Sequence, residues 1–387
     1  MAFIWQQAIE EAQQLRHRLH KLPELGWQEV NTAKLIREQL TSLGIPWAAC
    51  AELGTLARLN PTGKHYPHIA LRADMDALPI TEQSGQAWSS VHAGCMHACG
   101  HDGHTATLLA TARYLKSIEF QLPGPVTLLF QPAEEGGHGA KKMIEDGALE
   151  GIDAIYGWHN WPAIPFGKIV CPDNIVMCGN GTFTISLTGV GGHASQPESC
   201  RDPVLAASAI TLALQQIISR RIPPQQAAVV SVSSIEAPSA PTVTPTYATL
   251  GGSIRVPNQA IRETVNRLII EISEQTAASY GVGCDVQIFP RYEATINHPE
   301  QAAYARQQWQ ETFGNDSLAE DVAVPIMASE DFSYYLQEIP GAFSLIGADD
   351  GPEHQALCHS PFYDFNDRLI PLVTQFYARL VGAPLPQ

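Results

Sequence analysis

The chain has 387 residues, of which 45% are hydrophobic and 16% are charged, and its formal net charge is −16. This composition is that of a globular protein and excludes wholesale disorder, and the length is enough for about two domains. The acidic balance, without any dense run of lysine and arginine, argues against nucleic-acid binding, because that function needs a basic face.

The N-terminal segment has the pattern of helices rather than of a targeting sequence. Its apolar residues recur at helical spacing among charges and glutamines, which predicts amphipathic helices near residues 4–20 and 29–43. It shows neither the basic start nor the continuous apolar core of a signal peptide, and no apolar run of the chain approaches the ~20 residues that span a bilayer. We therefore expect a cytoplasmic location and no membrane association. The eight cysteines, spread over so long a chain, are expected to be free thiols.

The first half of the chain alternates apolar strands with helices. The expected strands are Thr55–Leu59, His68–Arg72, Val126–Gln131 and Asp153–His159, and the expected helices between them are His104–Ile118 and Ala140–Asp146. This alternation indicates an α/β domain with a central, mostly parallel sheet. Sites in such domains lie beyond the carboxyl ends of the strands.

The pattern changes after about Gly179. The expected order is β-α-β-β-α-β, with strand Thr182–Gly189, helix Pro203–Ser219, strands Ala228–Ile235 and Tyr247–Val256, helix Gln259–Ser279 and strand Asp285–Phe289. This order is typical of a ferredoxin-like unit. A mixed pattern then returns and ends in a helix near 367–381. We therefore predict an α/β catalytic domain, residues 1–179 and 291–387, interrupted by a smaller ferredoxin-like α+β domain at residues 180–290.

Polar side chains follow three of the expected strands at the point where each strand ends. The segment "RADMD" places Asp74 and Asp76 after one strand, and "FQPAEEGGHGA" places Glu134 and Glu135 after the next. The segment "GWHNWP" places His159 at the end of a third strand. Because the carboxyl ends of parallel strands meet at one edge of a sheet, these groups are expected to converge.

The stretch "MHACGHDGHTA", residues 96–106, adds three histidines, a cysteine and an aspartate just ahead of an expected helix. Cys99 and His101 are spaced to reach one metal ion, whereas Asp102 is expected to be a first-turn or N-cap carboxylate. Thiolate, imidazole and carboxylate suit borderline divalent ions, and a bridging thiolate can hold two ions about 3.5–4 Å apart. A carboxylate that does not bind the metal can move a proton. The sequence therefore predicts a metal centre that acts on water and a carbonyl.

At these residues the sequence resembles the M20 metallopeptidase family, in the aminoacylase-like branch that includes hippurate hydrolases and plant auxin-conjugate hydrolases. The motifs that carry the resemblance lie between Arg72 and Asp367 and read "RADMDALPI", "MHACGHDGHTA", "FQPAEEGG", "GWHNWP", "GVGGHAS", "ASEDFS" and "CHSPFYDFND". The β-α-β-β-α-β insert falls where that family carries its lid domain.

The resemblance implies a dinuclear centre with two divalent ions per subunit, which the donor chemistry allows to be Mn, Zn, Ni or Co. Cys99 would bridge the two ions. His101 and Glu135 would complete the protein ligands of one ion, and His159 and His359 would complete those of the other.

Five further residues take roles through the same resemblance. Glu134 would be the general base for metal-activated water, and Asp74 would hold a ligating imidazole or the geometry of the site. His193 would reach the active site of a partner subunit and stabilise the oxyanion, which implies a homodimer built through the insert. Arg255 would pair with the substrate carboxylate. Thr242 stands where many relatives have a substrate-contacting asparagine, which puts the substrate range in question.

The sequence thus predicts an amidohydrolase that cleaves N-acyl or N-aroyl amino acids to a carboxylate and a free amino acid. A dipeptidase or carboxypeptidase that acts on short peptides is the alternative, because the same centre would serve both reactions. A non-catalytic metal-binding homologue is disfavoured, because Glu134 and all five expected ligands are present. A thiol redox protein built on Cys95 and Cys99 is disfavoured by their spacing.

Overall fold

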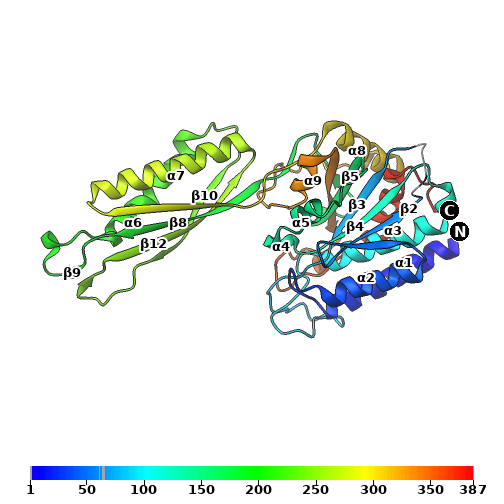
Figure 1. The fold of residues 1–387 in the computed structure, drawn as a ribbon, viewed down its shortest axis with the longest axis horizontal. Coiled ribbons are helices and arrows are strands. Elements are labelled where there is room, and N and C mark those ends of the chain that lie inside the picture. Colours follow the sequence, from blue (N-terminus) through cyan, green and yellow to red (C-terminus); the bar gives the residue numbers. More distant parts are fainter. Residues whose placement is uncertain (1, 61, 63–65, 387) are drawn as a thin grey trace. The chain divides into compact units, whose positions relative to one another are not determined.

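The computed structural model describes residues 2–60, 62 and 66–386, and the chain divides into two compact units (Figure 1). The larger unit comprises Met1–Val176, Ile296–Val324 and Asp331–Gln387, and the smaller unit comprises Met177–Thr295 and Pro325–Glu330. The smaller unit is thus inserted into the larger one along the chain, and it also takes in a short segment that follows the insert.

The larger unit is built around a sheet that has seven strands within the described residues. Their order across the sheet is β1 (Trp47–Cys50), β2 (Gly54–Leu59), β4 (Val126–Gln131), β3 (Ile69–Asp74), β5 (Ala154–Pro165), β15 (Gly341–Asp349) and β6 (Ile169–Val170). Strands β4, β3, β5 and β15 pair in parallel, whereas the pairings of β1, β2 and β6 are antiparallel. The predicted α/β class with a mostly parallel sheet is confirmed.

Helices cover both faces of this sheet. They are α1 (Ala2–Lys21), α2 (Val30–Ser42), α3 (His101–Ser117), α4 (Glu134–Gly137), α5 (Gly139–Glu145), α8 (Pro299–Phe313), α9 (Ser333–Glu338) and α10 (Leu369–Leu380). Helix α3 packs against α1, α10 and β3, whereas α5 packs against β4 and α9 against β15. Every residue of β3 and β4 is buried, because side chains that alternate along a covered strand all meet a layer of protein.

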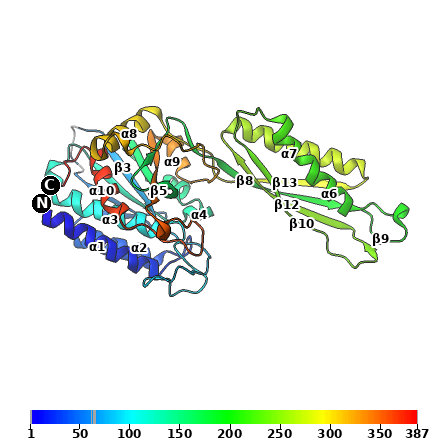
Figure 2. The same ribbon diagram turned by 180° about the vertical axis from the view of Figure 1, so that it is seen from behind.

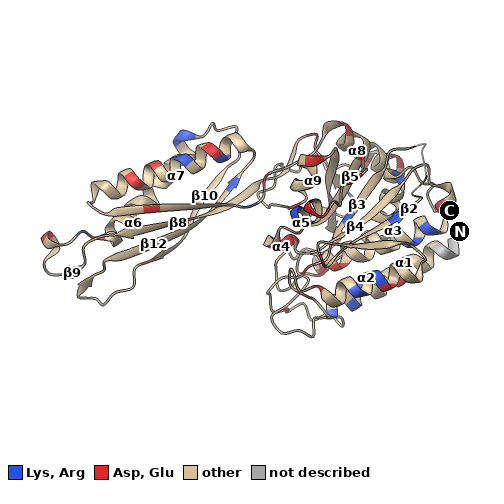
Figure 3. Cartoon of the chain, in the orientation of Figure 1, with Lys and Arg blue, Asp and Glu red and all other residues tan. Residues whose placement is uncertain are grey.

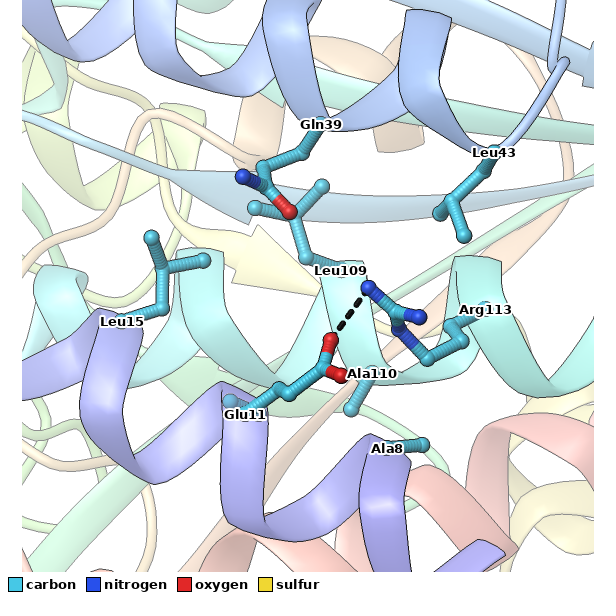
Figure 4. Close-up of a pocket in the computed structure, with 9 residues that line it drawn as sticks. Ala8, Glu11, Leu15, Gln39, Leu43, Leu109, Ala110 and Arg113 are labelled. Carbon is cyan, nitrogen blue, oxygen red and sulfur yellow. Dashed lines mark ion pairs between the residues drawn. The ribbon is translucent and has the colours of Figure 1, made fainter. Parts of the chain in front are cut away.

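Helices α1, α2 and α3 lie side by side on one side of this unit (Figures 1 and 2). The gap between them is lined by apolar side chains such as Leu15, Leu43 and Leu109, and an ion pair joins Glu11 of α1 to Arg113 of α3 (Figure 4). The cavity there measures about 20 Å³, little more than one water molecule occupies. It is therefore a packing gap.

Within the described residues, no helix is both long and apolar enough to cross a membrane.

The smaller unit is a four-stranded antiparallel sheet with two helices. The sheet order is β10 (Val229–Glu236), β12 (Tyr247–Val256), β8 (Gly179–Thr188) and β13 (Gly283–Pro290), and the helices are α6 (Pro203–Leu214) and α7 (Gln259–Ser279). Its core is built from apolar residues of α6, α7 and one face of the sheet. The predicted ferredoxin-like order is confirmed. A short ladder of β9 (Gly192–His193) with β11 (Val243–Thr244) lies outside this sheet.

Several element boundaries differ from the prediction, including the start of α3, the end of β5 and the end of α6. Helix α3 begins at His101 rather than at His104, so the metal-binding stretch enters the helix itself. Strand β5 does not end at His159 but continues to Pro165, because Asn160 and Trp161 pair with β15. The α-helix expected to reach Ser219 ends at Leu214 and is followed by a π-helical turn.

A buried ion cluster attaches α1 to the first turn of α3. Arg16 is 0% exposed, its Nε lies 3.0 Å from an oxygen of Asp102, and it also pairs with Asp364 and Asp367. His20 lies 2.8 Å from the same Asp102 carboxylate. Burial alone would raise the pKa of Asp102, but the charges of Arg16 and His20 outweigh burial and hold that pKa well below its usual value. The predicted first-turn carboxylate is therefore an anchor for α1.

We predict that Arg16→Met lowers the free energy of unfolding by about 3–5 kcal/mol, because it leaves buried carboxylates without their cation. Urea denaturation in the presence of a chelator measures this loss without a contribution from metal. Arg18→Met is the matched control, since Arg18 lies exposed on the same helix. Equal unfolding free energies for the two variants would show that the cluster does not stabilise the fold.

Candidate metal centre

The turn Cys99–Gly100–His101 places a thiol and an imidazole at the start of α3. Gly100 has φ +98°, a left-handed conformation that side chains disfavour. A Cβ atom at this position would lie 2.3 Å from the Asn160 Oδ1 atom and 2.5 Å from the Tyr363 hydroxyl. Only glycine fits both the dihedral angle and the space, and the turn therefore depends on it.

The two glutamates follow β4 in a second constrained turn. Ala133 has φ +52°, and its N–H donates to the Glu29 carboxylate at 2.7 Å. The N–H of Glu135 donates to the Asp76 carboxylate at 2.9 Å. These backbone hydrogen bonds fix the segment that carries Glu134 and Glu135.

The remaining predicted ligands come from β5 and from a loop near the C-terminus. The Nδ1–H of His159 donates to the Asn160 carbonyl at 2.6 Å, so its Nε2 carries the lone pair and lies 3.2 Å from the Cys99 sulfur. His359 has φ +68°, and its backbone N–H donates to the Ala98 carbonyl at 2.7 Å. Its Nε2 lies 3.0 Å from a carboxylate oxygen of Glu135.

The structure brings all five predicted ligands together around the Cys99 sulfur. The donor atoms of Cys99, His101 and His159 lie within 4.8 Å of one another, and so do those of Cys99, Glu135 and His359. The predicted pairing joins His101 with Glu135 and His159 with His359. The donor atoms of His101 and Glu135 also lie within 4.8 Å of one another, whereas no group found among the described residues joins His159 with His359. Which ligands share an ion stays a prediction, whereas the shared position of Cys99 is common to both arrangements.

His101 provides the clearest test of whether these residues fit a metal. Its Nδ1 lies 3.0 Å from the Asp76 carbonyl oxygen and 3.1 Å from the Asp76 carboxylate, both of which accept a proton. Its Nε2 is buried and makes no hydrogen bond to any described residue. An imidazole that donates through one nitrogen and keeps the other for a cation is the usual arrangement of a metal-binding histidine. The donor set therefore fits borderline divalent ions.

The local charges favour a cation. Burial by itself would lower the pKa of His101, but Asp74, Asp76 and Glu135 outweigh burial and raise that pKa to about 10. A hydrogen bond with Cys358, then burial and the charge of Glu135, raise the pKa of the Cys99 thiol. A divalent ion that binds here must displace these protons, and its charge replaces theirs.

His159 differs from the other two predicted histidine ligands, His101 and His359, whose pKa values are raised. Burial, followed by the charge of His104, lowers the pKa of His159 well below its usual value. The imidazole is therefore neutral at physiological pH, with its Nε2 lone pair directed toward the Cys99 sulfur. No proton has to leave this residue before a metal binds.

Asp74 is not one of the predicted ligands, but it lies close to them. Its carboxylate accepts from Arg72 at 2.5 Å and lies 2.6 Å from the His104 Nδ1 atom, while the His101 Nε2 atom is 3.6 Å away. The other nitrogen of His104 lies 2.7 Å from the Asn160 side-chain oxygen. Asp74 thus contacts a histidine that neighbours the ligands, and its predicted positioning role stays a prediction.

Glu134 is 6% exposed and lies against the ligands. One of its oxygens is within 4.8 Å of donor atoms of His101 and Glu135. It also accepts the backbone N–H of Asp331 at 3.2 Å. A buried carboxylate beside the donor set is placed to exchange a proton with a water held there.

The three predicted residues of the smaller unit fall into two groups. His193 pairs with Val243 in the β9–β11 ladder, and the Thr242 carbonyl accepts the N–H of Ala194 at 2.9 Å, so His193 and Thr242 lie close together. Arg255 is half-buried near the end of β12, eight residues from Tyr247, where that strand begins. Eight strand residues span about 27 Å, so the two groups lie at opposite ends of this unit.

Two buried carboxylates near the centre received no role from the sequence. Asp76 holds both His101 and Glu135, and Glu29 holds the turn at Ala133. Asp76 has a sequence signal, since residues two apart in extended backbone share a face and Asp74 stands two residues before it. Glu29 has no such signal, because it reaches the centre from the loop before α2.

Comparison with known proteins agrees with this geometry. The model of peptidase family M20/M25/M40 matches residues 70–383. An IAA-amino acid hydrolase of Arabidopsis thaliana is 39% identical over 95% of this chain and 83% of its own length. The hippurate hydrolase of Campylobacter jejuni is 36% identical over 96% of this chain and 95% of its own. The crystal structure of a dinuclear metal-binding peptidase of the M20 family from Bacillus subtilis has a TM-score of 0.83 and 31% identity, covering 97% of this chain and 98% of its own.

We predict that protein purified without chelator contains about two transition-metal ions per chain, and that Cys99→Ala lowers this content to one ion or fewer, because both candidate groups lose their shared donor. Elemental analysis by mass spectrometry measures it. Cys50→Ala is the matched control, since Cys50 is a buried free thiol on β1 that belongs to neither group. Full metal content in Cys99→Ala would contradict the assignment of a shared sulfur.

Proposed function

The chain belongs to peptidase family M20/M25/M40, and from this premise we propose that it cleaves the amide bond of N-acyl or N-aroyl amino acids to a carboxylate and a free amino acid. Its family and its hydrolase relatives make it a metal-dependent amidohydrolase. The single observation that supports the finer proposal is a buried glutamate, Glu134, beside a donor set centred on Cys99. Hippurate and IAA-amino acids, for which two relatives are named, are amino acids with an acyl group on nitrogen.

Cys99, His101, Glu135, His159 and His359 would hold two divalent ions. When bound, the ions supply polarisation of the amide carbonyl and a lowered pKa for a water molecule. Manganese, zinc, nickel and cobalt all accept thiolate, imidazole and carboxylate, so the donor set alone does not select among them.

Glu134 is the general base in this proposal. The Asp331 N–H donates to one oxygen of its carboxylate, which limits rotation of the group. Glu134 takes a proton from the attacking water and returns it to the nitrogen of the leaving amino acid. Its burial strengthens the effect of neighbouring charges on this transfer, because the local dielectric is low.

Arg255 is the proposed partner of the substrate carboxylate. Burial, followed by the charge of Arg291, lowers the pKa of Arg255, and neither is enough to neutralise a guanidinium. A half-buried guanidinium gains more than an exposed one from a bidentate carboxylate. Thr242 would contact the substrate through the hydroxyl of a short side chain.

The separation within the smaller unit supports a homodimer. His193 lies in the β9–β11 ladder, whereas Arg255 lies near the far end of β12, so the two side chains of one subunit cannot both contact one small substrate. We propose that Arg255 serves the site of its own subunit and that His193, as oxyanion donor, serves the site of a partner. Helix α6 offers an apolar surface for such contact, since Leu205 is 54% exposed and Leu212 is 75% exposed. Strand β10 is an edge strand of the same unit.

A cytoplasmic location completes the proposal. All eight cysteines are free thiols, and five of them are buried. Free thiols persist in reducing compartments, whereas secreted proteins of this kind more often pair them.

A peptidase with the same centre is the alternative. A free carboxylate on the product amino acid would suit Arg255 in either reaction, so only the group on the other side of the scissile bond distinguishes them. Turnover of N-acetyl and N-benzoyl amino acids, compared with that of dipeptides, decides between the two.

We predict that Glu134→Gln lowers kcat for an N-benzoyl amino acid by about 10²–10⁴-fold, because the amide cannot accept the proton from water. Metal content should stay equal to that of the unmodified protein. Glu145→Gln, an exposed position on α5, is the matched control and should keep full activity. Full turnover by Glu134→Gln would rule out its role as base.

Complementation tests the partner assignment of His193. We predict that His193→Ala and Glu134→Gln are each nearly inactive alone, and that their co-expression restores activity to about a quarter of the unmodified value. Half of the dimers formed at random contain one subunit of each kind, and each such dimer has one complete site. Co-expressed variants that are no more active than either alone would show that His193 acts within its own subunit or not at all.

A further inference from the structure

A second pocket lies at the opposite edge of the same central sheet. It measures about 360 Å³, within the range of small-molecule sites, and it opens where β3 begins at Ile69 and β5 begins at Ala154. These two residues are register partners in the sheet. The predicted metal ligands instead lie toward the carboxyl ends of the strands of this sheet. Nothing in the proposed mechanism uses this pocket.

Three phenol rings and two carboxylates give the pocket its chemical character. Tyr66, Tyr156 and Tyr304 line it together with Asp153 and Glu300, and both carboxylate residues are exposed. Among the described residues, no basic side chain lines it. Aromatic faces and carboxylates both attract cations, so the lining as a whole favours positive charge.

The phenol hydroxyls are not equivalent. The hydroxyls of Tyr66 and Tyr304 lie 2.5 Å apart, and Tyr304 donates to the Arg379 carbonyl at 3.3 Å, so the proton between the two phenols comes from Tyr66. Tyr156 is only 4% exposed, and its hydroxyl makes no hydrogen bond to any described residue. A hydroxyl in a pocket wall can offer both a donor and an acceptor to a ligand.

We propose that this pocket binds a primary alkylammonium ion. The N–H groups of the ammonium donate to the Tyr156 hydroxyl and to the carboxylates of Asp153 and Glu300, while the faces of the tyrosines stabilise its charge. Apolar contacts with Ile69 and Ala154 take the alkyl chain. Asp153 keeps one oxygen for the ligand, because its other oxygen accepts the His68 backbone N–H at 2.8 Å.

Three other kinds of ligand fit this pocket less well than a primary alkylammonium ion does. A neutral alcohol of the same shape would leave the two carboxylates without a counter-charge. A quaternary ammonium would satisfy the aromatic faces but has no N–H group for Tyr156. An anion would be repelled by both carboxylates.

Titration of the metal-loaded, full-length protein with n-butylammonium chloride, followed by ligand-observed NMR, tests the proposal. We expect saturable binding of n-butylammonium, and binding of n-butanol and of tetramethylammonium that is at least several-fold weaker. Tyr156→Phe should weaken n-butylammonium binding by about fivefold, the value of one hydrogen bond. Glu300→Gln should weaken it by about two- to fivefold, as for a partly exposed ion pair.

Glu338→Gln is the matched control, because Glu338 is exposed on α9 and does not line the pocket. It should bind n-butylammonium as the unmodified protein does. Equal binding of n-butanol, or tetramethylammonium binding as tight as that of n-butylammonium, would overturn the proposal. So would binding that Tyr156→Phe and Glu300→Gln leave unchanged, which would place the ion elsewhere, or the absence of saturable binding.

Discussion

The burial of several carboxylates beside the candidate metal ligands is the constraint on which this centre depends. Asp74, Asp76 and Glu134 are almost fully buried at one edge of the sheet. Arg72 is a buried counter-charge there, and it pairs with Asp74. Asp74, together with Asp76 and Glu135, still raises the pKa of His101 to about 10, so protons and metal cations compete for the same sites. The arrangement that makes this edge costly to fold is the one that makes it attract divalent cations.

The backbone around the donors is held in conformations that most residues avoid. Gly100, Ala133 and His359 all have positive φ angles, and each stands at or next to a predicted ligand or base. For the two residues other than glycine, this conformation costs about 1–3 kcal/mol. Hydrogen bonds from Ala133 to Glu29 and from His359 to Ala98 oppose that strain. Rigidity at the donors therefore comes from the surrounding structure and exists before any ligand binds, as a site that must hold precise angles requires.

Much of the fold could be predicted from the sequence, because hydrophobic period and element order are local properties. The β-α-β-β-α-β insert was visible as a change from buried strands to alternating ones. The local pattern does not locate β15, residues Gly341–Asp349, and it therefore gives the wrong end for β5, since the second half of β5 is a strand through its pairing with β15. The start of α3 at His101 depends on Gly100, whose conformation follows from contacts with Asn160 and Tyr363. Contacts between distant segments therefore set these element boundaries, which the local sequence pattern does not predict.

The metal site likewise has features that the motifs predict and features that only the geometry shows. The motifs predict which residues gather at the centre, but they do not predict which aspartate of "RADMD" contacts which histidine. Asp74 is the last residue of β3 and Asp76 follows it two residues later, while His101 and His104, three apart on a helix, are about 5–6 Å apart on one side. Asp76 holds His101 while Asp74 holds His104. The strand end and the helix start thus fix each other at two points, and a change in the register of either would move a ligand.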